Sequence, residues 1–281
     1  MTNTVALSII TPCLNEEFNI SRCLKSTENC SDYSIEHIIV DGGSTDSTES
    51  IANSYGHIRW VTQKSDGIYG AMNEGVRLAK GTYLFFLGAD DQVLLDSLKM
   101  AIDHCSSETV LVVGKVDFKD DNPSFSLGYL INQNISHQAI IYHASVFEKY
   151  GKYSTKYPIW ADYEFNLRLS DRIKPDQINY EPTDFAILGE FGLSSKKLDK
   201  AFLCDKVEIV RNYASLENFK KFGPGLYPQC SIDNLLFGSI WKGMVYGMYS
   251  FILFGKFIYL TRVLTFLKER LLGRTDKYEF I

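Results

Sequence analysis

The sequence predicts an α/β protein with a mostly parallel central sheet flanked by helices, followed by a C-terminal helical tail. Apolar, β-branched runs alternate with amphipathic stretches up to about residue 113, which is the pattern of parallel strands joined by helical crossovers. Several runs end directly in glycine or acidic residues, which is typical of the edge where open α/β sheets bind ligands. With 281 residues, of which 45% are hydrophobic, the chain can bury one large core.

The strands predicted in the first half are short apolar runs that end at turn-forming residues. Pro12 ends the first strand, and Asn15 is placed to cap the helix after it. A later helix, ended by Gly81, carries a polar stripe that includes Tyr69 and Asn73, and such a stripe usually faces water. We expect strands at 5–11, 35–40, 58–63, 83–87 and 110–113, and helices at 15–26, 68–80 and 94–105.

The second half is less regular. Residues 115–134 are polar and rich in turn formers, so they predict little. Asp162 stands where the N-cap of a helix is expected; as a cap it would contribute about 1 kcal/mol, and the alternative is a general base facing a cleft. The remaining expected elements are a strand at 136–142, a helix at 144–150, a strand at 185–188 and a helix at 196–213.

Two acidic turns follow predicted strands. Asp90 and Asp91 come directly after the most apolar run, where a metal or polar ligand would bind in an open sheet, although an Asp-Asp pair is more often a solvated turn. Asp41 begins a turn with two glycines that can expose backbone N–H groups to a phosphate or ribose. An ordinary connection between a strand and a helix has the same composition, so both alternatives remain open here.

The composition excludes several classes of protein. A net charge of −5 argues against nucleic-acid binding, which needs a basic face. The six cysteines have no metal-ligand spacing and are typical of reduced thiols in a cytoplasmic protein. We see no signal peptide, and no G-x-G-x-x-G motif of a dinucleotide-binding oxidoreductase follows the first strand.

Several motifs follow one another in a familiar order. They are Ser8-Ile-Ile-Thr-Pro-Cys-Leu-Asn15-Glu16, Val40-Asp-Gly-Gly-Ser-Thr-Asp46, Ser65-Asp-Gly-Ile-Tyr-Gly-Ala-Met-Asn73, Phe85-Phe-Leu-Gly-Ala-Asp90-Asp91, Ser136-His-Gln and the Asp162-to-Arg168 spacing. Over about residues 5–195 the chain resembles family 2 of the GT-A glycosyltransferases. It looks most like the bacterial branch that builds capsular polysaccharide, exopolysaccharide or O-antigen units. The resemblance implies a GT-A domain at residues 1–215 and a separate tail at 216–281.

The resemblance also implies a role for each matching residue. In this family such residues bind a nucleotide-sugar donor, hold Mg²⁺ or Mn²⁺ on its diphosphate and remove a proton from the acceptor hydroxyl. The matches are Thr11, Pro12, Asn15, Glu16, Asp41 and Ser44 for the nucleoside; Asp66, Gly67 and Asn73 for the nucleotide and sugar; Asp90 for the metal; His137 near the diphosphate or acceptor; and Asp162 for the catalytic base.

The chain departs from the family pattern at two positions. Gly88 replaces the first acid of the DxD motif, so the metal would depend on Asp90, with help from phosphate, water and Asp91. Gly42 replaces an Asp that contacts the nucleotide base in many relatives. The resemblance therefore implies nucleotide binding more strongly than it implies a preference for uridine. The implied activity is an inverting transfer to a hydroxyl of a glycan or polyprenyl-diphosphate-linked acceptor. The alternative is a non-catalytic nucleotide-binding or scaffold protein that has kept the fold.

The tail is apolar and then basic. Residues 243–255 carry no charge, but 13 residues are too few for a bilayer that needs about 20. Basic residues follow from Arg262 to Lys277, so we expect an interfacial helix on the inner face of the cell membrane. The alternatives are a helix packed on the core and a dimer interface.

Overall fold

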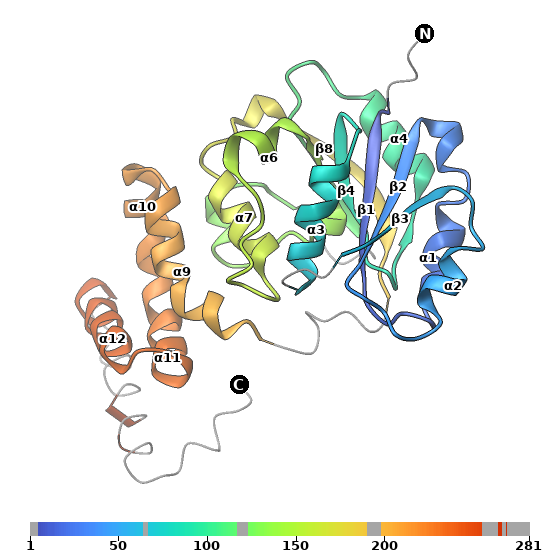
Figure 1. Ribbon diagram of the computed structural model, residues 1–281. Helices are drawn as coiled ribbons and strands as arrows, with labels where there is room; N and C mark the ends of the chain where they lie inside the picture. The colour runs from blue at the N-terminus through green and yellow to red at the C-terminus, as the bar shows by residue number, and fades with distance from the viewer. Residues whose placement is uncertain are drawn as a thin grey trace. The chain divides into compact units, whose positions relative to one another are not determined.

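The computed structural model describes residues 5–63, 67–116, 123–189 and 198–254, together with residues 264, 265 and 268. The chain divides into two compact units, Met1–Lys197 and Leu198–Ile281 (Figure 1).

An eight-stranded sheet forms the first unit, in the order β3-β2-β1-β4-β7-β6-β8-β5. Strands β3, β2, β1 and β4 are parallel, as the sequence predicts, whereas β7 runs antiparallel to both of its neighbours, β4 and β6. β8 pairs parallel with β6 and antiparallel with the short β5. The strands are β1 (Leu7–Cys13), β2 (Ile35–Asp41), β3 (Ile58–Thr62), β4 (Tyr83–Phe86), β5 (Gln92–Val93), β6 (Leu111–Val116), β7 (Ile140–His143) and β8 (Ile178–Ile187).

Helices cover both faces of the parallel half of the sheet. Successive β2 side chains point to opposite faces, so Ile39 packs with α1 and α2 while Ile38 and Val40 pack with α3. The helices of this unit are α1 (Ile20–Ser26), α2 (Thr48–Ala52), α3 (Gly67–Leu78), α4 (Leu95–Asp103), α5 (Leu127–Leu130), α6 (Ser145–Tyr150) and α7 (Ala161–Leu169), with short 3₁₀ turns at Cys30–Tyr33, His137–Ala139 and Pro175–Gln177.

The first strand and helix differ from the sequence prediction. β1 continues through Pro12, which pairs with Val40. Proline is tolerated there because β4 pairs with β1 only as far as Ile10, so the strand ladder needs no N–H from Pro12 on that side. Asn15 is not the helix cap: α1 begins at Ile20 after Asn19, and Asn15 has a φ of 55° in the turn before it. The extra residues between strand and helix form the loop that faces the acidic turn after β2.

Aromatic packing fixes α7 against the sheet. Phe147 and Phe165 stack with ring centroids 4.8 Å apart, and Tyr142 and Tyr153 meet Phe165 at 5.9 Å and 5.1 Å. Such ring pairs add to the stability gained from their burial. All nine residues of α7 are buried, so this helix is a rigid support for the side chains at its N-terminus.

The second unit is helical. It consists of α9 (Lys200–Tyr213), α10 (Leu216–Phe222), a 3₁₀ turn at Gly223–Leu226, α11 (Tyr227–Phe237) and α12 (Ile240–Phe254). α9 packs on α11, and the boundary between the two compact units falls before α9. In the described part of the chain, no helix combines the length and the apolar character that crossing a bilayer requires.

Candidate functional site

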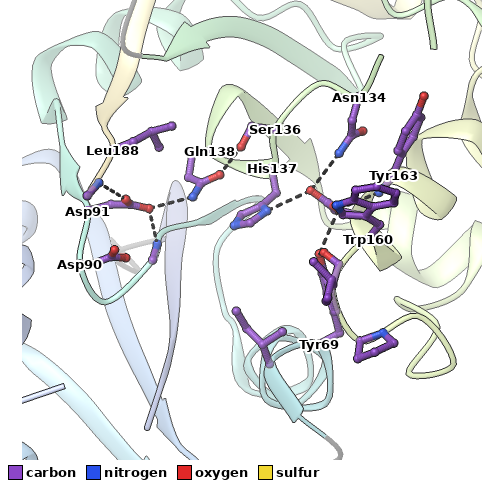
Figure 2. A pocket seen from close by; sticks show the side chains of 16 residues that line it. Tyr69, Asp90, Asp91, Asn134, Ser136, His137, Gln138, Trp160, Tyr163 and Leu188 are labelled. Atoms are coloured by element: carbon purple, nitrogen blue, oxygen red, sulfur yellow. Dashed lines mark hydrogen bonds and ion pairs between the residues drawn. The ribbon is translucent and has the colours of Figure 1, made fainter. Parts of the chain in front are cut away.

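A pocket of about 480 Å³ opens where β4 ends (Figure 2). Asp90 and Asp91 lie on one side of it and Asp162 on the other, with the ring of His137 between them. Asp90 and Asp162, which lie 72 positions apart in the sequence, thus line one cavity. This is the arrangement expected if one carboxylate holds a metal ion and the other accepts a proton. The other wall is apolar and aromatic, formed by residues such as Ile68, Pro158, Ile159, Trp160 and Tyr163.

Asp91 organises the acidic end of the pocket. Its carboxylate accepts hydrogen bonds from the backbone N–H of Gly88 at 3.0 Å, from Nε2 of Gln138 at 2.8 Å and from the backbone N–H of Gly189 at 2.8 Å. Asp91 is only 3% exposed, so it is not part of a solvated turn. It joins the ends of β4, β7 and β8 and turns the neighbouring Asp90 toward the pocket.

Four groups lie within hydrogen-bond distance of the Asp162 carboxylate. Oδ1 accepts from the Tyr69 hydroxyl at 2.9 Å and from the Tyr163 backbone N–H at 2.8 Å. Oδ2 accepts from Nδ2 of Asn134 at 3.2 Å and pairs with Nδ1 of His137 at 3.1 Å. The residue lies in the first turn of α7 after the cap residue Trp160, so it is not the N-cap itself. A positive helix terminus favours a negative charge at this position.

Two residues of α3 hold the side of the pocket that carries Asp162. Tyr69 is 4% exposed, and the single hydrogen of its hydroxyl can be donated either to the Ile159 carbonyl at 2.7 Å or to Asp162 Oδ1 at 2.9 Å. Asn73 donates to the Tyr153 carbonyl at 2.9 Å and accepts from the Tyr153 N–H at 3.0 Å. The expectation that this stripe faces water was wrong for Tyr69 and Asn73, which α7 and the segment before it cover, whereas Arg77, the third residue of the stripe, is exposed. Only the four-residue spacing of the two polar side chains could have indicated a shared partner.

A buried ion pair fixes the far end of α7. Arg168 pairs with Glu164 one turn earlier and donates to the carbonyls of Tyr150 and Lys152 at 3.0 Å. These bonds tie α7 to the segment that Asn73 also holds.

The residues expected to bind the nucleoside form a separate, interlocked pair of loops. Asp41 is buried and accepts from the Ser44 hydroxyl at 2.5 Å and from the N–H groups of Gly43 and Ser44 at 3.1 Å. Asn15 donates its backbone N–H to Ser44 Oγ at 2.8 Å and accepts from the Thr45 N–H at 2.9 Å. The two loops therefore hold each other without a ligand.

The remaining expected residues have different surroundings. Thr11 is fully buried in β1 and its hydroxyl contacts Nε2 of His37 at 2.9 Å, so the structure does not expose it to a ligand. Burial raises the pKa of Glu16 and a hydrogen bond from Asn19 opposes this, while the negative charge of Asp90 adds to the increase. Glu16 thus lies within electrostatic reach of the pocket. Gly67 begins α3 with a φ of 71°, and Asp66 lies outside the described residues.

The residues around Asp90 are compatible with a divalent cation. Mg²⁺ commonly takes one or two protein carboxylates and completes its shell with phosphate and water. A Cβ on Gly189 would lie 2.5 Å from Asp90 Oδ2, so glycine at this position keeps the space beside the carboxylate open. In the described parts of the chain no three His, Cys, Asp or Glu side chains form a metal cage, so Asp90 would bind the ion together with a substrate.

A mostly parallel sheet with acidic loops at its carboxyl edge and a second acid across the pocket defines the GT-A class of glycosyltransferase. Residues 8–164 match the family model for glycosyl transferase family 2, and the chain belongs to this family.

Relatives and solved structures agree with this assignment. A PGL/p-HBAD biosynthesis glycosyltransferase of Mycobacterium tuberculosis is 39% identical over 215 residues, which cover 70% of this chain and 82% of the relative. An uncharacterized glycosyltransferase of the same species is 30% identical over 206 residues, 67% of this chain and 78% of that one.

Among solved structures, residues 1–349 of Staphylococcus aureus TarS in complex with UDP-GlcNAc align with a TM-score of 0.59 at 15% identity, covering 98% of this chain and 94% of that one. A longer TarS chain, of which 44% is covered, aligns over 83% of this chain with a TM-score of 0.61 at 17% identity. The mannosyltransferase PcManGT of Pyrobaculum calidifontis, in complex with GDP-Man and Mn²⁺, aligns with a TM-score of 0.52 at 15% identity over 97% of this chain and 88% of that one. These likenesses confirm the fold.

Proposed function

We propose that the protein is an inverting glycosyltransferase that moves a sugar from a nucleotide-diphosphate donor to an alcohol. The observation that carries the proposal is the single pocket with Asp90 on one side and Asp162 on the other. Displacement in one step requires the leaving diphosphate and the group that deprotonates the acceptor to lie on opposite sides of the anomeric carbon, which inverts its configuration.

Asp90 would hold Mg²⁺ or Mn²⁺ beside the diphosphate, where the ion would neutralise the charge of the leaving group. Support comes from PcManGT, which has the same fold and was crystallised with Mn²⁺ and GDP-Man. The interlocked loops of Asn15, Asp41 and Ser44 are the proposed nucleoside end of the donor site, together with Pro12, Glu16, Asp66 and Gly67. UDP-sugars are the proposed donors, and the TarS complex with UDP-GlcNAc supports this choice.

The apolar, aromatic wall of the pocket suits the carbon face of a sugar ring, because ring C–H groups pack on aromatic faces. Trp160 and Tyr163 line this wall beside Asp162. The proposed acceptor is therefore a hydroxyl of a glycan, free or linked to a polyprenyl diphosphate, in surface polysaccharide synthesis.

The test is a panel of UDP-glucose, UDP-galactose, UDP-N-acetylglucosamine and GDP-mannose, each with Mn²⁺, measured by thermal stabilisation and by release of nucleoside diphosphate. A donor at 100 times its Kd stabilises the native state by about 2.7 kcal/mol. We expect Asp90→Ala to weaken calorimetric binding of UDP with Mn²⁺, and Asp162→Asn to abolish turnover while donor binding persists. Binding of nucleotide without any release or transfer would instead favour the non-catalytic alternative.

A further inference from the structure

The carboxylate of Asp162 is enclosed by four neighbouring groups, which leave no open direction for an acceptor. A carboxylate offers about four lone-pair directions. In this site three of them accept from Tyr163, Asn134 and His137, and the fourth faces the Tyr69 hydroxyl, whose single hydrogen is shared with the Ile159 carbonyl. All four groups lie at 2.8–3.2 Å, and Asp162 is 5% exposed. An acceptor hydroxyl could donate directly to Asp162 only after one of these buried donors had lost its bond, which costs about 1–3 kcal/mol.

His137 presents a nitrogen that fits the task better. Its Nδ1 faces Oδ2 of Asp162 at 3.1 Å, and because an ionised carboxylate only accepts, Nδ1 carries the hydrogen. The neutral ring then has its lone pair on Nε2. Among the residues that the structure describes, none forms a hydrogen bond with this Nε2, and the ring, 14% exposed, lines the pocket between Asp162 and the Asp90–Asp91 side (Figure 2).

We propose that Nε2 of His137 receives the proton of the acceptor hydroxyl, and that Asp162 is the positioning residue that fixes the ring and its tautomer. The proposal rests on the proposed transferase function. In the step, the acceptor oxygen forms its bond to the anomeric carbon as its proton passes to Nε2. The bond from that carbon to the diphosphate oxygen breaks, and its electron pair leaves with the nucleoside diphosphate.

The charges around the ring suit this step. Asp162 from α7 and the two acids Asp90 and Asp91 from the loop after β4 are the charged groups that line the pocket with it, and the hydroxyls of Tyr69 and Tyr163 are the other titratable ones. No lysine or arginine is among the described lining residues. The imidazolium that forms would therefore face carboxylates on both sides, and its paired Asp162 would stabilise it as in other aspartate–histidine arrangements.

The first test does not depend on turnover. In the full chain labelled with ¹⁵N-histidine, two-bond correlations assign the tautomer of His137, with His137→Gln identifying its signals. We expect Nδ1–H with an unprotonated Nε2 at neutral pH, both alone and with UDP and Mg²⁺. Asp162→Asn should shift the signals toward a mixture of tautomers. A wild-type ring protonated on Nε2 in the neutral form would overturn the proposal.

The second test is kinetic, with diphosphate release from the donor panel and water as the acceptor. We expect His137→Ala to lower kcat at least 100-fold, as for loss of a general base, with UDP affinity within about twofold of wild type. Added imidazole should restore part of kcat in this variant. The control is His104→Gln, a histidine with 55% side-chain exposure whose partner is Glu181.

The proposed transferase function and the proposed role of His137 can be disproved separately. If the wild type releases no diphosphate from any donor, the transferase function fails, and the tautomer alone decides the role of the ring. If the wild type turns over and His137→Ala keeps its rate, Asp162 takes the proton directly and the inference about His137 is wrong.

Discussion

At Gly88 the structure leaves no room for a side chain. A Cβ there would lie 2.5 Å from Oδ2 of Asp91, and that carboxylate is fixed by three hydrogen bonds. The first acid of the family's DxD motif therefore could not be accommodated while Asp91 keeps its position. The carboxylate of Asp91 fills the space that a side chain at position 88 would need, and Asp90 remains the acid that faces the pocket.

This packing predicts opposite results at two glycines. Gly88→Ala should lower the free energy of unfolding by about 2 kcal/mol, because overpacking displaces a bonded carboxylate. Gly42→Ala is the matched control, since its nearest neighbour would lie 3.5 Å from the new Cβ, and we expect it to be neutral or slightly stabilising. Urea denaturation measures both. Equal stabilities of the two variants would show that Asp91 can move aside.

His37 predicts a pH dependence of stability. The ring is buried between Thr11 and Thr27 at 2.9 Å, and burial, with a smaller effect from His57, lowers the pKa of His37 to about 3. In the unfolded chain an imidazole titrates near 6.5. Between these values the unfolded state binds more protons, so stability decreases as pH falls.

From pH 7 to pH 5 this group should cost the wild type about 2 kcal/mol of unfolding free energy. His37→Gln should be less stable at pH 7 but should lose less on acidification. Denaturant titrations at the two pH values measure the difference. A variant with the wild-type pH dependence would assign the acid sensitivity to other groups.

Helix α3 holds both Asp162 and the segment before α7. Tyr69 bonds to Asp162, and one turn later Asn73 forms a reciprocal pair with the backbone of Tyr153, whose ring packs on Phe165 of α7. A change at Asn73 therefore acts on α7 through the segment that both helices share.

We expect Asn73→Ala to reduce stability by about 1–3 kcal/mol, because it leaves two buried backbone groups of Tyr153 without a partner. kcat should fall with it, since Asp162 depends on the same packing. UDP affinity, measured by calorimetry, should change little. A large loss of UDP affinity at unchanged stability would instead make Asn73 a direct ligand of the nucleotide, as the family resemblance implies.

Local patterns predicted the parallel half of the fold, but they left both Asp90 and Asp162 open between a structural and a functional role, and only the family resemblance pointed to a shared site. β1, β2 and β4 are buried and largely apolar, β3 is a short half-buried run, and turn-forming residues follow them, so local composition and periodicity were enough for these strands. The antiparallel β7 and the buried Tyr69 were missed for a common reason. Strand direction and the burial of a polar stripe depend on which distant segment packs alongside, and a run such as Ile140–His143 carries no sign of its partner.

The second unit turns an apolar helix face outward. On α12 the exposed large apolar side chains are Ile240, Trp241, Met248, Tyr249, Ile252 and Leu253. Trp241, Met248 and Ile252 lie on one face with Tyr249 beside them, while Tyr246 and Ser250 on another face are buried. An apolar face of this kind is typical of an interfacial helix, and the basic residues that follow in the sequence would attract anionic lipid.

This face predicts binding to anionic vesicles. The full chain should float with liposomes that contain phosphatidylglycerol, less with phosphatidylcholine alone, and less again at high salt, because surface charges are screened. Deleting residues 241–281 would also expose α11, so the sharper variant is the double substitution Trp241→Gln and Ile252→Gln, which should abolish flotation. Leu216→Gln, at a residue 71% exposed on α10, is the control and should float normally. Wild-type protein that stays with the unbound fraction, and forms a dimer that the double variant does not, would make the same face a contact between two copies of the chain.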